Sequence, residues 1–381
     1  MLKSDSEKSS GDIYQQLQRH LDELPTGFPS TKSGVEIRLL KRLFSLEEAK
    51  IATMLKFGVE KLEPLDSIFE RLKPLGYTKL DLEKRLDTMV KKGLIIGKTE
   101  TGIKSYANAM LIVGIFEFQV DKLTDDFIQD LTQYTKEKWS LEYAKIRIPQ
   151  LRTIPVGLNI EHSIGISTYD DIKRFIEEGK GPYMVANCVC RQVKDKVGEP
   201  CSATSRRRLC LGFGYVAQLY IESECGQEIT KDECVEILQQ NEKEGLVFQT
   251  DNSKDGIIIC SCCNCCCPGI SGLKNSLTPG KISTSNYYAE IDPDLCISCG
   301  DCVDRCPMLA ISLENSNASI SRDRCIGCGN CIILCESEAI SLQTREKEYI
   351  PFDSMEDLYV KILERREIIK KREEKRRSRK K

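Results

Sequence analysis

Histidine is nearly absent from this chain of 381 residues, which holds only His20 and His162. Two isolated imidazoles do not make the histidine pair of a zinc site, and they leave little scope for histidine acid–base catalysis. Nucleotide-binding motifs are missing too, because no Gly-x-Gly-x-x-Gly opens a helix after an expected strand and no phosphate-binding loop occurs. The sequence therefore offers no recognisable site for a soluble hydride carrier.

Long apolar runs are also missing. The run Ala109–Phe116 is far shorter than the roughly 20 residues that cross a bilayer, and the polar start Met1–Lys8 has no apolar core of a secretory signal. We therefore expect a cytoplasmic protein with no membrane span. In that reducing compartment, clustered cysteines are expected to bind metals or to act in redox chemistry rather than to form disulfides.

The net charge of −2 hides an uneven distribution. Arg365–Lys381 contains eleven basic and three acidic residues, and the rest of the chain carries a net charge of −10. An acidic body disfavours nonspecific binding of nucleic acid and suits a carrier that docks to basic partners. We expect residues 346–381 to form a charged, basic, solvated tail that is partly helical.

The length predicts two to three domains. Residues 1–44 are polar and interrupted by proline and glycine, so we expect a flexible leader with one short helix over 13–24. Residues 45–120 begin with a capping box formed by Ser45 and Glu48. Three helices are expected there, the last over 78–93, followed by two short strands over 94–96 and 105–107.

Three helices followed by a hairpin resemble a winged helix, a fold that implies DNA binding. However, residues 45–107 carry twelve basic and ten acidic side chains, whereas a duplex reader concentrates positive charge on one face. We therefore favour a protein-docking or structural role for this domain and keep DNA binding as the rival.

Residues 121–286 are expected to form a central α+β domain. Helices are predicted over 124–139, 172–176, 211–221 and 230–241, and strands over 183–186, 246–248 and 257–259. Thr230 and Glu233 form a second capping box at the start of the last of these helices. Cys225 and Cys234 are interpreted as structural, since Cys234 shares a helix face with Ile237 and Leu238.

In contrast to histidine, cysteine is abundant: the chain has twenty cysteines, about 5% of its residues. The strongest pattern lies near the C-terminus, where two motifs with spacing Cys-x2-Cys-x2-Cys-x3-Cys follow each other 29 residues apart. They are Cys296, Cys299, Cys302 and Cys306, then Cys325, Cys328, Cys331 and Cys335. Residues 287–345, with this repeat, resemble a bacterial-type ferredoxin domain that holds two 4Fe-4S clusters.

The resemblance implies that the last cysteine of each motif serves the other cluster. The implied ligand sets are Cys296, Cys299, Cys302 and Cys335 for the first cluster, and Cys325, Cys328, Cys331 and Cys306 for the second. A doubled spacing with a crossed fourth ligand is not a zinc-finger pattern. Glu336 stands where the second motif of the family usually has proline, and it could alter the charge near one cluster.

Ten further cysteines form a less regular constellation in the central domain. They are Cys188, Cys190, Cys201, Cys210, Cys260, Cys262, Cys263, Cys265, Cys266 and Cys267. Neighbours in an extended chain point to opposite sides, so the members of the run after Cys260 cannot all serve one small site. Ten thiols suffice for two cubanes, or for one cubane and a separate thiol pair or zinc site. Arg191 could offset the charge of a thiolate cluster.

Residues 150–343 also resemble ferredoxin-like proteins of anaerobic bacteria and archaea, in which three motifs precede a two-cluster ferredoxin. The motifs are Cys-x-Cys-Arg at 188–191, Cys-Leu-x-Phe-Gly at 210–214 and Cys-Cys-x-Cys-Cys-Cys at 262–267. This resemblance implies electron transfer in anaerobic metabolism, with one or two clusters beyond the ferredoxin pair.

Taken together, the sequence predicts an α+β protein with a winged-helix domain, a central cysteine-rich domain, a two-cluster ferredoxin domain and a basic tail. We expect a carrier of single electrons between redox protein partners, as an accessory or subunit of an anaerobic oxidoreductase rather than a self-contained enzyme. Two alternatives stay open: a redox-sensing transcription regulator that uses the winged helix, and a reductase that acts at an unusual cluster near Cys260–Cys267.

Overall fold

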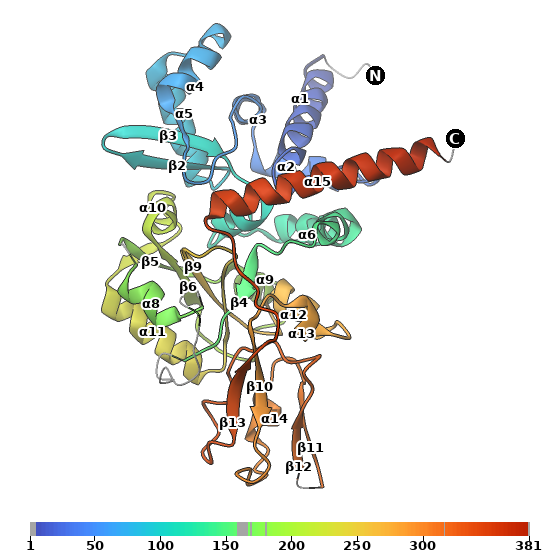
Figure 1. Ribbon diagram of the computed structural model, residues 1–381. Helices are drawn as coiled ribbons and strands as arrows, with labels where there is room; N and C mark the ends of the chain where they lie inside the picture. The colour runs from blue at the N-terminus through green and yellow to red at the C-terminus, as the bar shows by residue number, and fades with distance from the viewer. Residues whose placement is uncertain (1–4, 158–166, 168–169, 180, 316, 380–381) are drawn as a thin grey trace. The chain divides into compact units, whose positions relative to one another are not determined.

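The computed structural model (Figure 1) describes residues 5–157, 167, 170–179, 181–315 and 317–379, so that His162 lies outside the described residues. The chain mixes helices with mostly antiparallel strands, in keeping with an α+β class. It divides into two compact units. The first comprises the chain up to Ile148, Gln218–Gly226 and the segment from Met355 onward, and the second comprises Pro149–Ala217 and Gln227–Ser354.

The first unit begins with two helices where a flexible leader was expected. They are α1 (Asp5–Asp22) and α2 (Val35–Leu43). Leu17, Leu21 and Leu39 are buried, and the Tyr14 hydroxyl donates a hydrogen bond of 2.8 Å to the Phe44 carbonyl. α1 covers most of the short helix expected over 13–24, but the rest of the leader prediction was wrong: Pro25, Gly27 and Pro29 lie in the connection between the two helices and do not prevent either helix from packing.

Residues 45–120 follow the expected order of helices and strands. The capping boxes predicted at Ser45 and at Thr230 are both present, and Thr78 caps the third helix. The elements are α3 (Leu46–Ala52), β1 (Glu63–Pro64), α4 (Leu65–Leu72), α5 (Lys79–Lys91), β2 (Ile95–Glu100) and β3 (Ile103–Asn108), and the strands form a sheet in the order β1-β3-β2. This arrangement is compatible with a winged helix, which stays a prediction.

The rest of the first unit is helical. Short 3₁₀ and π turns follow β3 and lead to α6 (Asp125–Tyr134) and α7 (Ser140–Ile146). The last helix of the chain, α15 (Met355–Ser378), belongs to the same unit. The start of α15 is not a solvated tail, since Met355, Leu358, Tyr359 and Ile362 are buried. Arg366, one turn further on, donates a hydrogen bond of 2.7 Å to the Asp22 carbonyl. The part of the predicted tail from Met355 to Ile362 thus contributes to the core of this unit.

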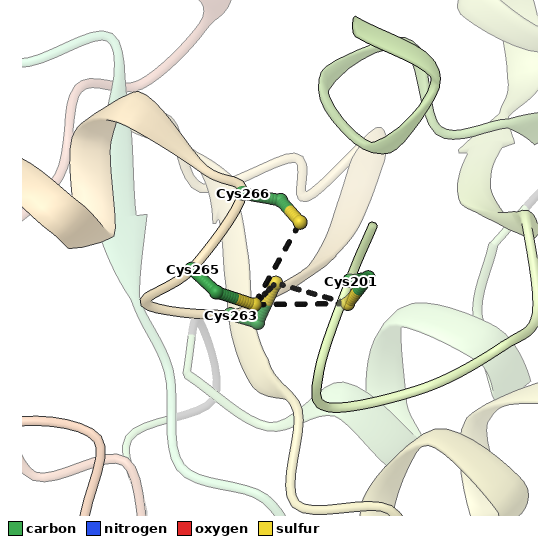
Figure 2. A group of neighbouring side chains, drawn as sticks. All are labelled: Cys201, Cys263, Cys265 and Cys266. Carbon is green, nitrogen blue, oxygen red and sulfur yellow. Dashed lines mark hydrogen bonds between the residues drawn. The ribbon is translucent and has the colours of Figure 1, made fainter. Parts of the chain in front are cut away.

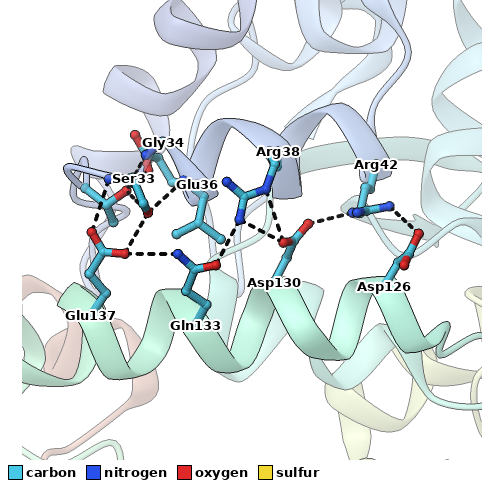
Figure 3. Close-up of polar contacts among 11 residues, drawn as sticks. Ser33, Gly34, Glu36, Arg38, Arg42, Asp126, Asp130, Gln133 and Glu137 are labelled. Atoms are coloured by element: carbon cyan, nitrogen blue, oxygen red, sulfur yellow. Dashed lines mark hydrogen bonds and ion pairs between the residues drawn. The ribbon is translucent and has the colours of Figure 1, made fainter.

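Charged side chains join α2 to α6 (Figure 3). The side chain of Asp130 is 6% exposed and accepts hydrogen bonds from both Arg38, at 3.1 Å, and Arg42, at 2.6 Å. Asp126 contacts the same Arg42 but is 68% exposed. Because a buried carboxylate with two cationic donors gains more than a solvated one, Asp130 is the member of this network on which the packing of α2 depends.

The second unit is built on a six-stranded antiparallel sheet in the order β4-β8-β9-β6-β5-β7. Its strands are β4 (Leu151–Thr153), β5 (Tyr183–Asn187), β6 (Arg208–Phe213), β7 (Gln227–Ile229), β8 (Val247–Asp251) and β9 (Ile258–Cys262). The helices α8 (Ile172–Glu177) and α11 (Lys231–Lys243) contribute Phe175 and Leu238 to a buried core that also contains Leu211 and Ile259.

The helix predicted over 211–221 was partly wrong. Residues 208–213 form β6, and α10 (Gly214–Glu222) begins only at Gly214, whose φ of +55° turns the chain. Cys210 pairs with Ala186 of β5 on one side and with Cys260 of β9 on the other. Pairing on both edges fixes this apolar run as a central strand, which its sequence alone cannot distinguish from a buried helix.

The ferredoxin-like part of the same unit consists of short paired strands. β10 (Tyr287–Ile291) pairs with β13 (Ile340–Thr344), and β11 (Ile311–Glu314) pairs with β12 (Asn317–Ile320). Arg152 of β4 and Asp170 form a buried ion pair. Asn286, which precedes β10, donates a hydrogen bond of 2.9 Å to the Asp170 carboxylate and so joins the ion pair to the ferredoxin-like part. Burial raises the pKa of Asp170, and the charge of Arg152 opposes that rise.

No helix in the described part of the chain is both long and apolar enough to cross a membrane.

We expect Asp130→Ala to lower the free energy of unfolding of the first unit by about 2–3 kcal/mol, because it leaves two guanidinium groups without their buried acceptor. Asp126→Ala is the control and should cost less than about 1 kcal/mol, since its carboxylate is solvated. Trp139, the one tryptophan, is buried in this unit. Its fluorescence during urea denaturation measures both losses, and equal losses would contradict the assignment.

Candidate metal centres

The two Cys-x2-Cys-x2-Cys-x3-Cys motifs surround two cavities in the ferredoxin-like part. One cavity is lined by Cys296, Cys299, Cys302 and Cys335 together with apolar side chains such as Ile291 and Ile340. The loop before α14 (Asp301–Arg305) reaches this cavity through left-handed conformations at Ser298 (φ 60°) and Gly300 (φ 89°). These turns bring cysteines at every third position toward one centre.

The second cavity is lined by Cys306, Cys325, Cys328 and Cys331. Gly327 and Gly329 lie between its cysteines with positive φ. A β-carbon on Gly327 would lie 2.2 Å from the carbonyl oxygen of Tyr287, so only glycine fits against β10 here. In both cavities the fourth thiol comes from the other sequence motif, as the ferredoxin resemblance implies.

The two thiol sets differ in exposure. Cys325, Cys328 and Cys331 are all buried, whereas Cys299 of the first set is exposed. Burial raises the pKa of Cys328 to about 12, so its thiolate needs positive charge beside it. Backbone amides also face the second set, since the N–H of Ala289 lies 3.3 Å from the Cys325 sulfur and the N–H of Ala310 lies 3.3 Å from the Cys306 sulfur. Four thiols with amide donors suit the iron ions of a cubane.

Eight of the ten central cysteines fall into two groups. Cys210 and Cys260 lie opposite each other in β6 and β9, and Cys262 follows two residues later on the same face of β9. The sulfur of Cys262 is within hydrogen-bonding reach of Cys260 and Cys267, and Cys260 is within reach of Cys210. These four thiols, Cys210, Cys260, Cys262 and Cys267, are called the sheet-face group.

The second group gathers at the turn that follows β9 (Figure 2). The sulfur of Cys201 lies 3.7 Å from the sulfurs of both Cys263 and Cys265, and Cys265 lies 3.3 Å from Cys263 and 3.7 Å from Cys266. We call Cys201, Cys263, Cys265 and Cys266 the turn group. The buried side chains of Leu209 and Leu246 pack against it.

The division of the thiols into two groups agrees with the expectation that neighbouring side chains point to opposite sides, because Cys262 and Cys263 belong to different groups. Cys265 and Cys266 are neighbours but lie in one group, because residues 264–266 form a turn rather than an extended strand. The chain then returns Cys267, at the start of α12 (Pro268–Lys274), to the sheet-face group.

Cys188 and Cys190 lie at the start of α9 (Val189–Lys196) and belong to neither set of four. A hydrogen bond with Cys190, helped by the charge of Arg191, lowers the pKa of Cys188 to about 6. The Arg191 side chain is buried between the thiols. Its Nε donates to the Cys201 sulfur and its Nη1 to the Cys188 sulfur, both at 3.4 Å. The expectation that Arg191 would face thiols agrees with these contacts.

Two polar neighbours of the thiols were missed by sequence reasoning. Burial raises the pKa of Cys265, but hydrogen bonds from Ser202 and with Cys263 outweigh burial and lower this pKa to about 6. Gln249 of β8 lies opposite Cys260, with its oxygen 4.0 Å from the Cys267 sulfur. Ser202 follows Cys201 directly and could have been noticed, but only strand pairing brings Gln249 to the thiols.

The two remaining cysteines lie apart from these groups. Cys234 is buried beside Leu238 beneath the sheet, and burial raises its pKa to about 12. Cys225, in the first unit, donates a hydrogen bond of 3.4 Å to the Phe118 carbonyl and accepts one of 3.4 Å from Lys122. Their structural role stays a prediction.

Comparison with known protein families gives one match. Residues 288–336 match the family described as a 4Fe-4S dicluster domain, which covers the doubled cysteine motif. No curated protein and no solved structure matches the chain. The match, together with the cysteine groups, shows an iron–sulfur protein with an electron-transfer role.

If the last cysteine of each motif binds the other cluster, variants of two cysteines that serve the same cluster should lose the same signal. Cys335→Ala should remove the same EPR signal of the dithionite-reduced protein as Cys296→Ala, because both thiols line the first cavity. Cys306→Ala and Cys325→Ala should both remove the other signal. Cys234→Ala, the control, should retain both. Loss of the Cys325-dependent signal in Cys335→Ala would show that each motif serves its own cluster and would refute the crossed sets.

Proposed function

We propose that this protein passes single electrons between protein partners through at least three iron–sulfur clusters, as an accessory or subunit of an anaerobic oxidoreductase. A bound 4Fe-4S cluster supplies one-electron redox chemistry without proton or hydride transfer. The observation that carries the proposal is a shared core. Cys260, Cys262 and Cys267 of the sheet-face group pack in the same hydrophobic cluster as the cysteines of the second ferredoxin cavity.

This shared core supports a third 4Fe-4S site on the sheet-face group. Ile270, Met308 and Ile326 are fully or almost fully buried within it, and Asn264 donates a hydrogen bond of 2.9 Å to the Pro307 carbonyl next to Cys306. Asn330, beside Cys331, donates one of 3.0 Å to the Gly245 carbonyl. The first hydrogen bond joins the turn after β9 to the chain beside the second cavity, and the second joins the loop of that cavity to the chain that enters β8.

The first cavity is the one suited to exchange with a partner. Its Cys299 is exposed, and the exposed apolar side chains of Leu295 and Ile297 flank it. Four exposed acidic residues surround this patch: Asp292, Asp294, Asp301 and Asp304. An apolar centre with an acidic rim favours a redox partner whose docking face is basic.

The DNA-binding regulator has less support, because four of the five basic residues of the third helix and its C-cap are engaged in ion pairs. The pairs are Lys79 with Asp66, Arg85 with Asp81, Lys91 with Glu224 and Lys92 with Glu48. Charges that are already neutralised in this way attract phosphates weakly. A reductase acting near Cys260–Cys267 stays an alternative that spectroscopy with small substrates would test.

Three four-iron clusters predict about twelve iron and twelve acid-labile sulfide per chain after anaerobic purification. We expect Cys260→Ala to lower both to about eight while it retains the two ferredoxin EPR signals, because the sheet-face group loses a ligand. Cys225→Ala, the matched control, should keep all twelve. Eight iron in the wild-type protein, or an unchanged content in Cys260→Ala, would rule out the third cluster.

The acidic rim predicts slower electron transfer to a basic partner after charge reversal. We expect Asp294→Lys combined with Asp304→Lys to lower the rate constant of cytochrome reduction about tenfold at low ionic strength, with a basic c-type cytochrome as the probe. High salt should largely remove the difference, because it screens exposed charges. Stopped-flow absorbance measures the rate.

The matched control changes the net charge equally but in the first unit. Glu70 and Glu367 are both exposed there, and Glu70→Lys combined with Glu367→Lys should leave the rate within about twofold of the wild type. An equal decrease in both double variants would show that net charge, and not the rim, sets the rate.

A further inference from the structure

The turn group differs from the other thiol sets in the spacing of its sulfurs. All four lie within 4.8 Å of one another, and the shortest contacts are 3.3–3.7 Å. A tetrahedral ion with metal–sulfur bonds of about 2.3 Å holds its sulfurs about 3.8 Å apart. The turn group is therefore arranged around a single point, at the spacing that one metal ion requires.

The ferredoxin sets provide an internal comparison. Their thiols line two pockets and are not gathered within 4.8 Å of one another, as a cubane requires because its iron and sulfide ions stand between the thiolates. Among the residues that the structure describes, the turn group is the one set of metal-ligand side chains gathered within 4.8 Å. Its spacing is too close for a cubane core.

We propose that Cys201, Cys263, Cys265 and Cys266 hold one redox-inert divalent ion of the zinc class. Four thiolates are soft ligands that favour zinc among the common divalent ions without redox activity. All four coordination positions would be filled by the protein, which is typical of a structural site and leaves no place for a substrate. This site is separate from the electron-carrying clusters and does not depend on them.

Arg191 is a second, independent observation that points to an anionic complex at this place. It is 1% exposed, and it donates to the sulfurs of Cys201 and Cys188 and to the Ser261 carbonyl. Its Nη2 has no hydrogen-bond partner. A buried guanidinium is costly unless an anion lies beside it. Four thiolates around a divalent cation carry two excess negative charges, which this arginine would offset.

The ion would fix the two chain segments that supply the sheet-face group. Cys201 lies in the irregular connection between α9 and β6, and the other three ligands lie in the turn after β9. Cys262 immediately precedes that turn and Cys267 immediately follows it. Cross-linking the turn to the Cys201 segment therefore sets the direction in which both flanking thiols leave the turn.

Metal analysis of the holoprotein, purified without oxygen, tests the proposal. We expect one zinc per chain in addition to iron, and zinc-edge X-ray absorption should show four sulfur ligands at about 2.3 Å. This measurement needs no variant and is blind to the iron clusters. Less than half an equivalent of zinc, a mixed sulfur and nitrogen or oxygen shell, or a single iron ion in the place of zinc would overturn the proposal.

Variants locate the ion. Cys201→Ala should lose the zinc and retain the iron of the clusters, whereas Cys210→Ala, a cysteine of the sheet-face group, should lose about four iron and retain the zinc with its four sulfur ligands. The reverse pattern, or loss of about four iron in Cys201→Ala, would show that the turn group belongs to an iron–sulfur cluster. A wild-type protein with eight iron and one zinc would refute the third cluster but support the zinc site, so the two proposals fail separately.

Discussion

The geometry of the run from Cys260 to Cys267 determines how the central thiols divide. Side chains alternate along β9, so Cys260 and Cys262 point to the face that carries Cys210, whereas Ile259 enters the core beneath α11. The chain then leaves the strand and turns, which gathers Cys263, Cys265 and Cys266 before Cys267 returns at the start of a helix. Two neighbouring thiol groups arise from eight residues because a strand and a turn orient side chains differently.

Burial makes these groups dependent on positive charge. Thiolates in an apolar core are unstable unless metal ions or cationic side chains neutralise them. The second ferredoxin set and the sheet-face group share one hydrophobic cluster, so metal loading is expected to be part of the folding of this unit and not a later addition to a finished fold. Arg191 does for the turn group what backbone amides do for Cys306 and Cys325: it directs a donor at sulfur.

The sequence predicts what depends on local spacing and misses what depends on pairing between distant segments. The Cys-x2-Cys-x2-Cys-x3-Cys repeat and the caps at Ser45 and Thr230 are local, and the structure shows each motif and cap as expected. The division of the ten central cysteines requires the pairing of Cys210 with Cys260, which no spacing reveals. The same pairing makes 208–213 a strand instead of a helix. In the leader, burial of Leu17 and Leu39 orders a segment whose polar composition suggested disorder.

A redox-inert ion and an electron-carrying cluster have different tasks: the ion fixes the chain, and the cluster changes its charge at every transfer. A carrier works best when its ligands move little as its charge changes, because reorganisation costs free energy at every transfer. The connection that carries Cys201 between α9 and β6 is neither helix nor strand, so a bound ion would give this loop a further fixed point. Zinc has no second oxidation state and no preference for one geometry, so it can fasten that loop without itself exchanging electrons with the clusters. The cysteine-rich run would then use the same side chain for two tasks, and only the spacing of the sulfurs distinguishes them.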